Sequence, residues 1–248
     1  MRITLVGALG RMGAYVMEAV CGTGNECVSL VDPSYGETRL KTEHRHISEA
    51  AEETDVIIDF SFHTAAPEIA EYAAEKKIPV VIATTGHTES EKENIMKASE
   101  KTAVFYSGNM SIGIATLCGA VKKVLSVFDD ADVEIIETHH NRKADAPSGT
   151  ALMLFDAVKE VRPDAFANCG RSGNSKREKN EVGISSVRSG NIIGIHEVKI
   201  CTDFEQITIK HEAFDRALFA EGAIKAAEYI VGKEPGLYGM KDLMSETK

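Results

Sequence analysis

The 248-residue sequence has no tryptophan, and aromatic residues make up only 6% of it. Because 43% of the residues are hydrophobic, a core of ordinary size must be built from aliphatic side chains and methionine. No run reaches the roughly 18 apolar residues of a membrane-spanning helix. The first seven residues, Met-Arg-Ile-Thr-Leu-Val-Gly, do not resemble a secretory leader. We therefore expect a soluble, cytoplasmic protein without a membrane partner.

Cysteine pairs and an excess of positive charge are also absent. The five cysteines form no Cys-x-x-Cys pair, which argues against a disulfide framework or a zinc site and favours a reducing compartment. The formal net charge is −10. An acidic surface repels phosphate backbones, so we expect no nucleic-acid partner, although a local group of cations can still bind a small anion.

Short apolar runs and helix-like segments alternate over the first hundred residues. The runs are Ile3–Val6, Val28–Val31, Val56–Phe60, Val80–Ala83 and Val104–Tyr106. The helix-like segments between them are Arg11–Cys21, Thr64–Lys77 and Ser90–Ser99. Strands that are apolar without alternation are covered on both faces. The pattern therefore predicts an α/β fold with a Rossmann-type, doubly wound parallel sheet.

The pattern changes after about residue 110. Two helical segments, Gly113–Phe128 and Thr150–Val161, accompany four strand-like runs at Val133–Thr138, Ile184–Arg188, Ile192–Thr202 and Gln206–Ala213. Short turns join the last three runs, which predicts antiparallel pairing. Residues 163–181 are polar and predict a mobile loop. We expect an α+β domain with a mainly antiparallel or mixed sheet over residues 110–215, and a first domain of residues 1–109 closed by residues 216–248.

A glycine turn connects the first strand to the first helix. Gly7, Gly10 and Gly13 follow the spacing Gly-x-x-Gly-x-x-Gly, which permits a tight turn, the approach of a pyrophosphate and close packing of the helix on the sheet. Asp32 ends the second strand, where an acidic residue accepts hydrogen bonds from a ribose. The order of strand, turn, helix and acid predicts dinucleotide binding rather than a purely structural turn.

Asp32 also bears on the choice of cofactor. Its carboxylate repels a 2′-phosphate, and the next residue is Pro33 rather than an arginine. NADH is therefore the favoured cofactor. Arg11, Arg39 or Lys41 could still meet a phosphate, so the use of NADPH stays open.

A second group of polar residues follows the strand that ends near Thr138. His139, His140 and Lys143 lie in or near one loop, and Gly149 and Thr150 open the next helix. Imidazole is a natural proton carrier near neutral pH, and helix-opening amides bind anions. Two exposed or capping histidines would be the simpler interpretation, but the lysine and the helix start favour a site for a small carboxylate. Adjacent histidines on a strand point to opposite faces, so we predict no metal site.

These residues closely resemble one family. The segments Gly7–Gly13 and Glu134–Ala151 are similar to the two signature regions of dihydrodipicolinate reductase. The second reads as glutamate, His-His, Lys and Asp-Ala-Pro-Ser-Gly-Thr. Further similarities run through nearly the whole chain, at Asp59–Ser61, Ala83–Gly86, Ser107–Ser111, Val187–Asn191 and Gly194–His196.

The resemblance implies an NAD(P)H-dependent reductase of the diaminopimelate route to lysine. It would reduce dihydrodipicolinate, formed from 4-hydroxy-tetrahydrodipicolinate, to tetrahydrodipicolinate. His139 would be the general acid, and Lys143 would assist protonation and bind the substrate. His140, Gly149 and Thr150 would hold its two carboxylates. The implied cofactor residues are Gly7, Ala8, Leu9, Gly10, Arg11, Met12, Asp32, Ala83, Thr84, Thr85, Ser107, Gly108, Asn109 and Met110.

The resemblance also implies that residues 110–215 bind the substrate and pair their sheets in a homotetramer. The chain departs from the family at Ala83, where members often have glycine, at Ile195, where they often have glutamate, and in a short segment over residues 33–47. Two other functions remain open at this point. One is a different nicotinamide-dependent reductase of an imino dicarboxylate, and the other is a dinucleotide-sensing module without turnover.

Overall fold

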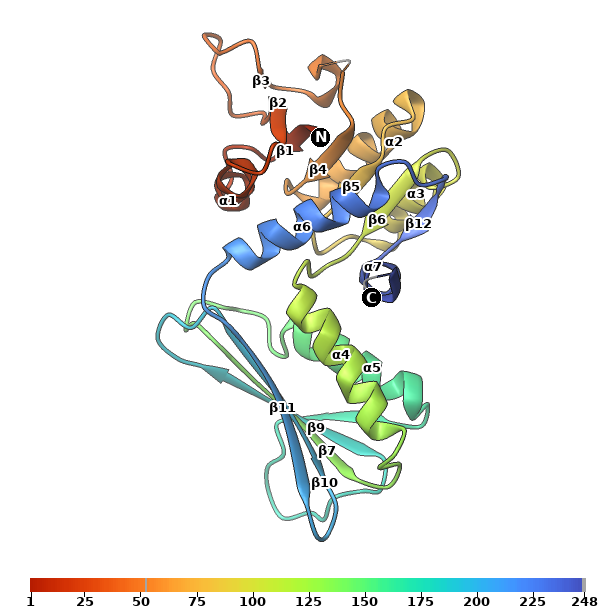
Figure 1. The fold of residues 1–248 in the computed structure, drawn as a ribbon. Coiled ribbons are helices and arrows are strands. Elements are labelled where there is room, and N and C mark those ends of the chain that lie inside the picture. Colours follow the sequence, from red (N-terminus) through yellow and green to blue (C-terminus); the bar gives the residue numbers. More distant parts are fainter. Residues whose placement is uncertain (52, 247–248) are drawn as a thin grey trace. The chain divides into compact units, whose positions relative to one another are not determined.

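The computed structural model describes residues 1–51 and 53–246. The chain divides into two compact units, one of Met1–Ser111 with Arg216–Lys248 and one of Ile112–Asp215 (Figure 1). Each unit has its own sheet and its own hydrophobic core, and each is described separately below. No helix in the described part of the chain is both long enough and apolar enough to cross a membrane.

The first unit contains a seven-stranded parallel sheet in the order β12-β6-β5-β4-β1-β2-β3. Its strands are β1 (Arg2–Val6), β2 (Glu26–Val31), β3 (Glu43–His44), β4 (Val56–Asp59), β5 (Val80–Ile82), β6 (Ala103–Tyr106) and β12 (Gly236–Tyr238). The predicted Rossmann-type sheet is confirmed. Strands β3 and β12 are too short to leave a clear apolar run, and the sequence pattern did not predict them.

Helices cover both faces of this sheet (Figure 1). Helices α1 (Arg11–Val20) and α6 (Ala217–Ile230) contact one another and lie on one face, and α6 also contacts β4, β5 and β6. Helices α2 (Ala66–Lys76) and α3 (Glu89–Ala98) cover the other face, and α7 (Met240–Glu246) packs near β12. The short helices η1 (Ile47–Glu49) and η2 (His63–Ala65) lie in the connections.

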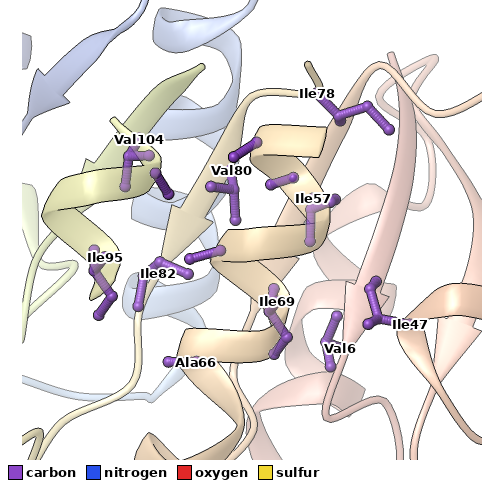
Figure 2. Close-up of a cluster of buried hydrophobic side chains, with 14 of the residues drawn as sticks. Val6, Ile47, Ile57, Ala66, Ile69, Ile78, Val80, Ile82, Ile95 and Val104 are labelled. Atoms are coloured by element: carbon purple, nitrogen blue, oxygen red, sulfur yellow. The ribbon is translucent and has the colours of Figure 1, made fainter. Parts of the chain in front are cut away.

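The core under α2 and α3 is aliphatic, as the scarcity of aromatic residues requires. Figure 2 shows Ile57, Val80 and Ile82 of the sheet facing Ile69 of α2 and Ile95 of α3. All of these side chains are buried. At about 25 cal/mol for each Å² of apolar surface, each such side chain stabilises the fold by about 2 kcal/mol.

The second unit contains a mixed sheet in the order β11-β10-β7-β9-β8. Its strands are β7 (Asp132–His139), β8 (Phe166–Cys169), β9 (Glu181–Arg188), β10 (Gly194–Cys201) and β11 (Gln206–Ala213). Helices α4 (Ile112–Leu125) and α5 (Gly149–Val161) pack together on one face (Figure 1). Along β7 half-buried and buried residues alternate, because one face of the sheet meets these helices and the other does not.

The pairing of the last three strands differs from the prediction. The β10–β11 hairpin is confirmed, but β9 does not pair with β10 because β7 lies between them, parallel to β9 and antiparallel to β10. Because β7 lies between them, β9 and β10 are two strand spacings apart, about 10 Å, and the five residues 189–193 can span this distance. This connection crosses the end of β7, where the Ser189 amide donates to the His139 carbonyl over 2.8 Å. A loop throughout residues 163–181 was also a wrong prediction, since β8 lies within it.

Candidate active site

The glycine turn between β1 and α1 has no room for side chains. Gly7 has a φ of +79°, and a Cβ atom there would lie 2.7 Å from the carbonyl carbon of Phe60. A Cβ atom on Gly13 would lie 2.4 Å from the carbonyl oxygen of Ala8, so α1 packs directly against the turn. The first amides of α1 have no partners within the helix, and free amides at a helix start bind anions. Only glycine therefore fits at these two positions, and the start of α1 offers amide donors of the kind that bind a pyrophosphate.

Asp32 follows β2 directly and is buried beside this turn. Its Oδ2 accepts a hydrogen bond from the Leu9 amide over 3.2 Å, and its Oδ1 accepts one from the Ser34 amide over 2.9 Å. The side chain is only 8% exposed. These bonds hold the carboxylate at the edge of the turn, where the sequence pattern places the ribose acceptor.

A cavity of about 690 Å³ opens beside the turn. Four predicted cofactor residues line it: Gly7, Leu9, Gly10 and Asp32. Of the basic side chains named for a phosphate, Arg11 faces a separate hollow next to Arg216, and Arg39 pairs with Glu49 over 2.9 Å. Arg45, which the sequence analysis missed, lines the cavity instead. Phe60 and Ser61 also line it, from the Asp59–Ser61 segment that resembles a cofactor-facing loop of the family. Lining residues that were not predicted are Pro33, Ser34, His46, Phe62 and Thr64.

The remaining predicted cofactor residues lie in the loops that follow β5 and β6, except Ala8 and Met12 of the glycine turn. Ala83 and Thr84 are nearly buried, and the Ala83 amide donates to the Asp59 carbonyl over 3.0 Å. The Ser107 hydroxyl donates to the Asn109 carbonyl over 2.8 Å. Met110 is buried, and its carbonyl oxygen lies where a side chain on Gly222 would stand. Thr85 and Gly108 are exposed.

In the second unit, His139 is held by a fully buried carboxylate. The Nδ1 atom of His139 lies 2.5 Å from Oε2 of Glu137. Arg188 donates to both oxygens of Glu137, over 2.9 and 2.8 Å, and the Ser148 amide donates to Oε1 over 3.1 Å. Because the carboxylate accepts from Nδ1, the Nε2 atom of His139 is left to exchange a proton.

The charges of this cluster follow from burial and hydrogen bonding. Burial by itself would raise the pKa of Glu137, but hydrogen bonds from His139, Arg188 and Ser186 outweigh it and hold the pKa far below its usual range. His196 lies edge-on to His139, with ring centroids 5.1 Å apart. Burial, aided by the charge of His139, lowers the pKa of His196 to about 4, so its ring is neutral at pH 7.

The other predicted substrate residues lie close by in the sequence of this unit. The Lys143 amide donates to the His140 carbonyl over 3.1 Å, which closes a turn after β7. The Lys143 ammonium pairs with Asp145 over 2.9 Å. Gly149 and Thr150 open α5, and the Ser148 hydroxyl caps that helix by accepting from the Ala151 amide. The helix start thus offers amides, and Lys143 a positive charge, to a small carboxylate.

Sequence reasoning assigned no role to Glu137, Arg188 or His196. Glu137 stands two residues before His139 on one strand, so the two side chains share a face, and this signal was present in the sequence. Arg188 and His196 come from the neighbouring strands: Arg188 is the register partner of His139, and His196 that of Glu137. Only the order of the strands reveals them. Within the described residues, no three His, Cys, Asp or Glu side chains are grouped to hold a metal ion.

A parallel sheet with a glycine turn, an acidic residue after its second strand and a cavity beside both defines a dinucleotide-binding unit. With the histidine cluster of the mixed sheet, these features define a nicotinamide-dependent oxidoreductase. Two family models match the chain: "Dihydrodipicolinate reductase, N-terminus" over residues 1–110 and "Dihydrodipicolinate reductase, C-terminus" over residues 113–244. The chain belongs to the dihydrodipicolinate reductase family.

Individual relatives agree with this assignment. The chain is 41% identical to a 4-hydroxy-tetrahydrodipicolinate reductase of Caldanaerobacter subterraneus subsp. tengcongensis, over 99% of this chain and 98% of the relative. It is 39% identical to that of Clostridium novyi, over 98% of each chain. Among solved structures, a dipicolinate-bound dihydrodipicolinate reductase from Paenisporosarcina sp. TG-14 has the same fold, with a TM-score of 0.82, 22% identity and 98% coverage of both chains.

Proposed function

We propose that the chain catalyses the NAD(P)H-dependent reduction of dihydrodipicolinate, formed from 4-hydroxy-tetrahydrodipicolinate, to tetrahydrodipicolinate in lysine biosynthesis. Membership of the family supports this activity. The observation that carries it in the structure is the buried Glu137–His139 pair, which belongs to the same short segment as Lys143 and the start of α5. A module that only senses dinucleotides has no need of an oriented proton donor, so we favour a catalytic function over a sensing one.

The residues of the first unit fit a nicotinamide dinucleotide. The tight turn that Gly7 permits and the adjoining cavity would hold the pyrophosphate, and Asp32 would accept hydrogen bonds from a ribose. Residues 83–85 and 107–110 would hold the nicotinamide. The bound cofactor supplies a hydride from its nicotinamide C4 to the substrate ring.

The second unit supplies the proton and the charge. The Gly149 and Thr150 amides and His140 would hold the two substrate carboxylates, with Lys143 beside them. Negative charge that develops along the reduced enamine is stabilised by the Lys143 ammonium and the loop amides. His139 then donates the proton from Nε2 to the adjacent carbon, while Glu137 stabilises its imidazolium form through Nδ1.

NADH is the preferred cofactor in this proposal. The buried carboxylate of Asp32 opposes a 2′-phosphate, and Pro33 adds no positive charge. Arg45 lies in the same cavity, and its Nε donates to the Pro33 carbonyl over 3.4 Å, so it offers a cation next to Asp32. Arg45 reduces the discrimination between the two cofactors, and NADPH is the slower alternative.

We also propose that the chain works in the cytoplasm as a homotetramer that pairs the sheets of the second unit. The face of this sheet that α4 and α5 leave uncovered carries half-buried apolar residues, among them Ile136 and Ile195. Sedimentation velocity measures the mass in solution. A species of four chains is expected, and a monomer at micromolar concentration would contradict this part of the proposal.

A coupled assay tests the activity. Pyruvate, aspartate semialdehyde and a dihydrodipicolinate synthase generate the substrate, and oxidation of NADH or NADPH is followed by its absorbance. We expect oxidation that depends on the synthase, with a higher rate for NADH. If a folded protein binds NADH but oxidises neither cofactor, the proposed activity is wrong.

A further inference from the structure

A chain of buried polar side chains lies within the first unit, apart from the cavity beside the glycine turn. Asp59 is fully buried at the end of β4 and accepts from the Thr84 hydroxyl over 3.4 Å. Oγ1 of Thr84 lies 2.9 Å from Nε2 of His87, and Nδ1 of His87 lies 3.2 Å from the Tyr106 hydroxyl. Thr84 and His87 are also nearly buried. None of the steps described above uses His87 or Tyr106.

The hydrogen bonds among these four side chains can all be satisfied if every donor points towards Asp59. The Thr84 hydroxyl has one proton, which it donates to Asp59. Its contact with His87 therefore requires a proton on Nε2 of the imidazole, and Nδ1 is left to accept from the Tyr106 hydroxyl. Burial lowers the pKa of His87, in keeping with a neutral ring. Every donor is thus directed towards the Asp59 carboxylate, which also accepts from the amide and the hydroxyl of Ser61 over 2.9 and 2.5 Å.

These hydrogen bonds connect three separate loops. Ser61 follows β4 and lines the cavity, Thr84 follows β5, and Tyr106 ends β6 immediately before Ser107. His87 lies between Thr84 and Tyr106, and its ring packs edge-on against that of Tyr106 with centroids 5.4 Å apart. A backbone bond from the Ala83 amide to Asp59 adds to the link between the first two loops. A side chain that joins these loops sets their spacing.

We propose that His87 is a positioning residue for the dinucleotide: by relaying hydrogen bonds from Tyr106 through Thr84 to Asp59, it holds the loops after β4, β5 and β6 in the conformation that binds NADH. This inference rests on the proposed function only in that these loops bind the cofactor. His87 acts through Thr84 and does not contact the reacting atoms. A network of buried polar side chains that is fully satisfied rigidifies the segments it joins, and the loss of one member removes a hydrogen-bond partner from each of its neighbours.

The test is the dissociation constant of NADH, measured by fluorescence titration of the full chain without the dicarboxylate substrate. Replacing His87→Phe keeps a ring of similar size but removes both nitrogen atoms, and we expect the dissociation constant to rise about tenfold. His87→Gln retains one donor and one acceptor and is expected to restore affinity to within about twofold of the original. Tyr106→Phe removes only the terminal donor, and a rise of about threefold is expected.

A matched control separates positioning from general destabilisation. Ile95→Val removes one methylene from the core next to α3, so it should lower the thermal midpoint and leave the NADH affinity unchanged. The inference is overturned if His87→Phe binds NADH as tightly as the original chain, or if all variants lose affinity in proportion to their thermal midpoints. Failure of the proposed reduction is a different result: the original chain would bind NADH and the His87 series would hold, but no dicarboxylate would be reduced.

Discussion

The two units of the chain build their proposed sites from different parts of the polypeptide. In the parallel-sheet unit the proposed site lies along the glycine turn, the start of α1 and the loops after β4, β5 and β6, and Gly7 and Gly13 are packed against neighbouring backbone. In the mixed-sheet unit the proposed proton donor lies among side chains on three adjacent strands, with Glu137 and His139 on β7 between Arg188 of β9 and His196 of β10.

This difference decides what kind of change each site tolerates. A glycine turn packed against neighbouring backbone is sensitive to added volume. A site made of buried charges tolerates small changes of shape but not the loss of one partner, because the remaining charge is then uncompensated. Substitutions in the two units should therefore differ in what they impair.

Gly7→Ala should abolish measurable NADH binding. The new Cβ would lie 2.7 Å from the carbonyl carbon of Phe60, and the φ of +79° is strained for any residue with a side chain. Gly22→Ala is the control, because Gly22 has a φ of +81° but nothing within 4 Å of its Cβ position. It should cost only about 1 kcal/mol of stability. Equal NADH affinities for the two variants would refute the role of the turn.

Glu137→Gln should lower kcat about a hundredfold, because the imidazolium form of His139 loses its buried counter-charge. NADH affinity should not change. The variant should also be less stable above pH 4.5, the ordinary pKa of glutamate, since the depressed pKa of Glu137 contributes stability there that is lost as the pH falls.

Steady-state kinetics and urea unfolding at several pH values measure both effects. Glu134→Gln is the control on β7, since Glu134 pairs with Arg177 and makes no contact with the histidine cluster in the described hydrogen bonds. A normal kcat for Glu137→Gln would show that His139 needs no oriented partner.

Asp59→Asn should be less harmful to stability at pH 8 than at pH 4, the opposite pH dependence to that of Glu137→Gln, while the loss of one acceptor oxygen costs hydrogen bonds at both values. Burial raises the pKa of Asp59 to about 6, so its anion costs stability above that pH and the cost disappears as the pH falls towards the ordinary value of 3.8. The difference between the effects at pH 8 and pH 4 is on the order of 2 kcal/mol. Urea unfolding at both pH values measures it, and an equal change in stability at the two values would contradict the assigned cause.

Arg45→Ala should weaken the use of NADPH about fivefold, the effect of one partly exposed cation, and leave NADH nearly unaffected. The ratio of kcat/KM for the two cofactors is the measurement. Arg39→Ala serves as the control, because Arg39 pairs with Glu49 and does not line the cavity. If only Arg39→Ala changes the ratio, the cation that meets the phosphate has been assigned wrongly.

The two units also differ in how much of each could be predicted from the sequence. The parallel sheet and the glycine turn follow from local patterns, because each βα unit is contiguous in the chain. The order β10-β7-β9 does not, since a short connection at residues 189–193 suggested a hairpin that does not form. Glu137 was accessible through its spacing from His139, whereas Arg188 and His196 are found only when the strand order is known.

The residues that line the cavity were also only partly predictable from the sequence. Asp32 was predicted because it follows a strand at a characteristic distance from the glycine turn, but Arg45 was not. It reaches the cavity because the chain returns through β3, a two-residue strand that leaves no clear pattern in the sequence.

We propose that one unit binds the dinucleotide and the other supplies the proton. The decisive variant is His139→Gln, with kcat in the coupled assay and the NADH dissociation constant measured on the same preparation. We expect kcat to fall about a thousandfold with NADH affinity unchanged. A kcat near that of the original chain, or a loss of NADH binding equal to the loss of kcat, would contradict it.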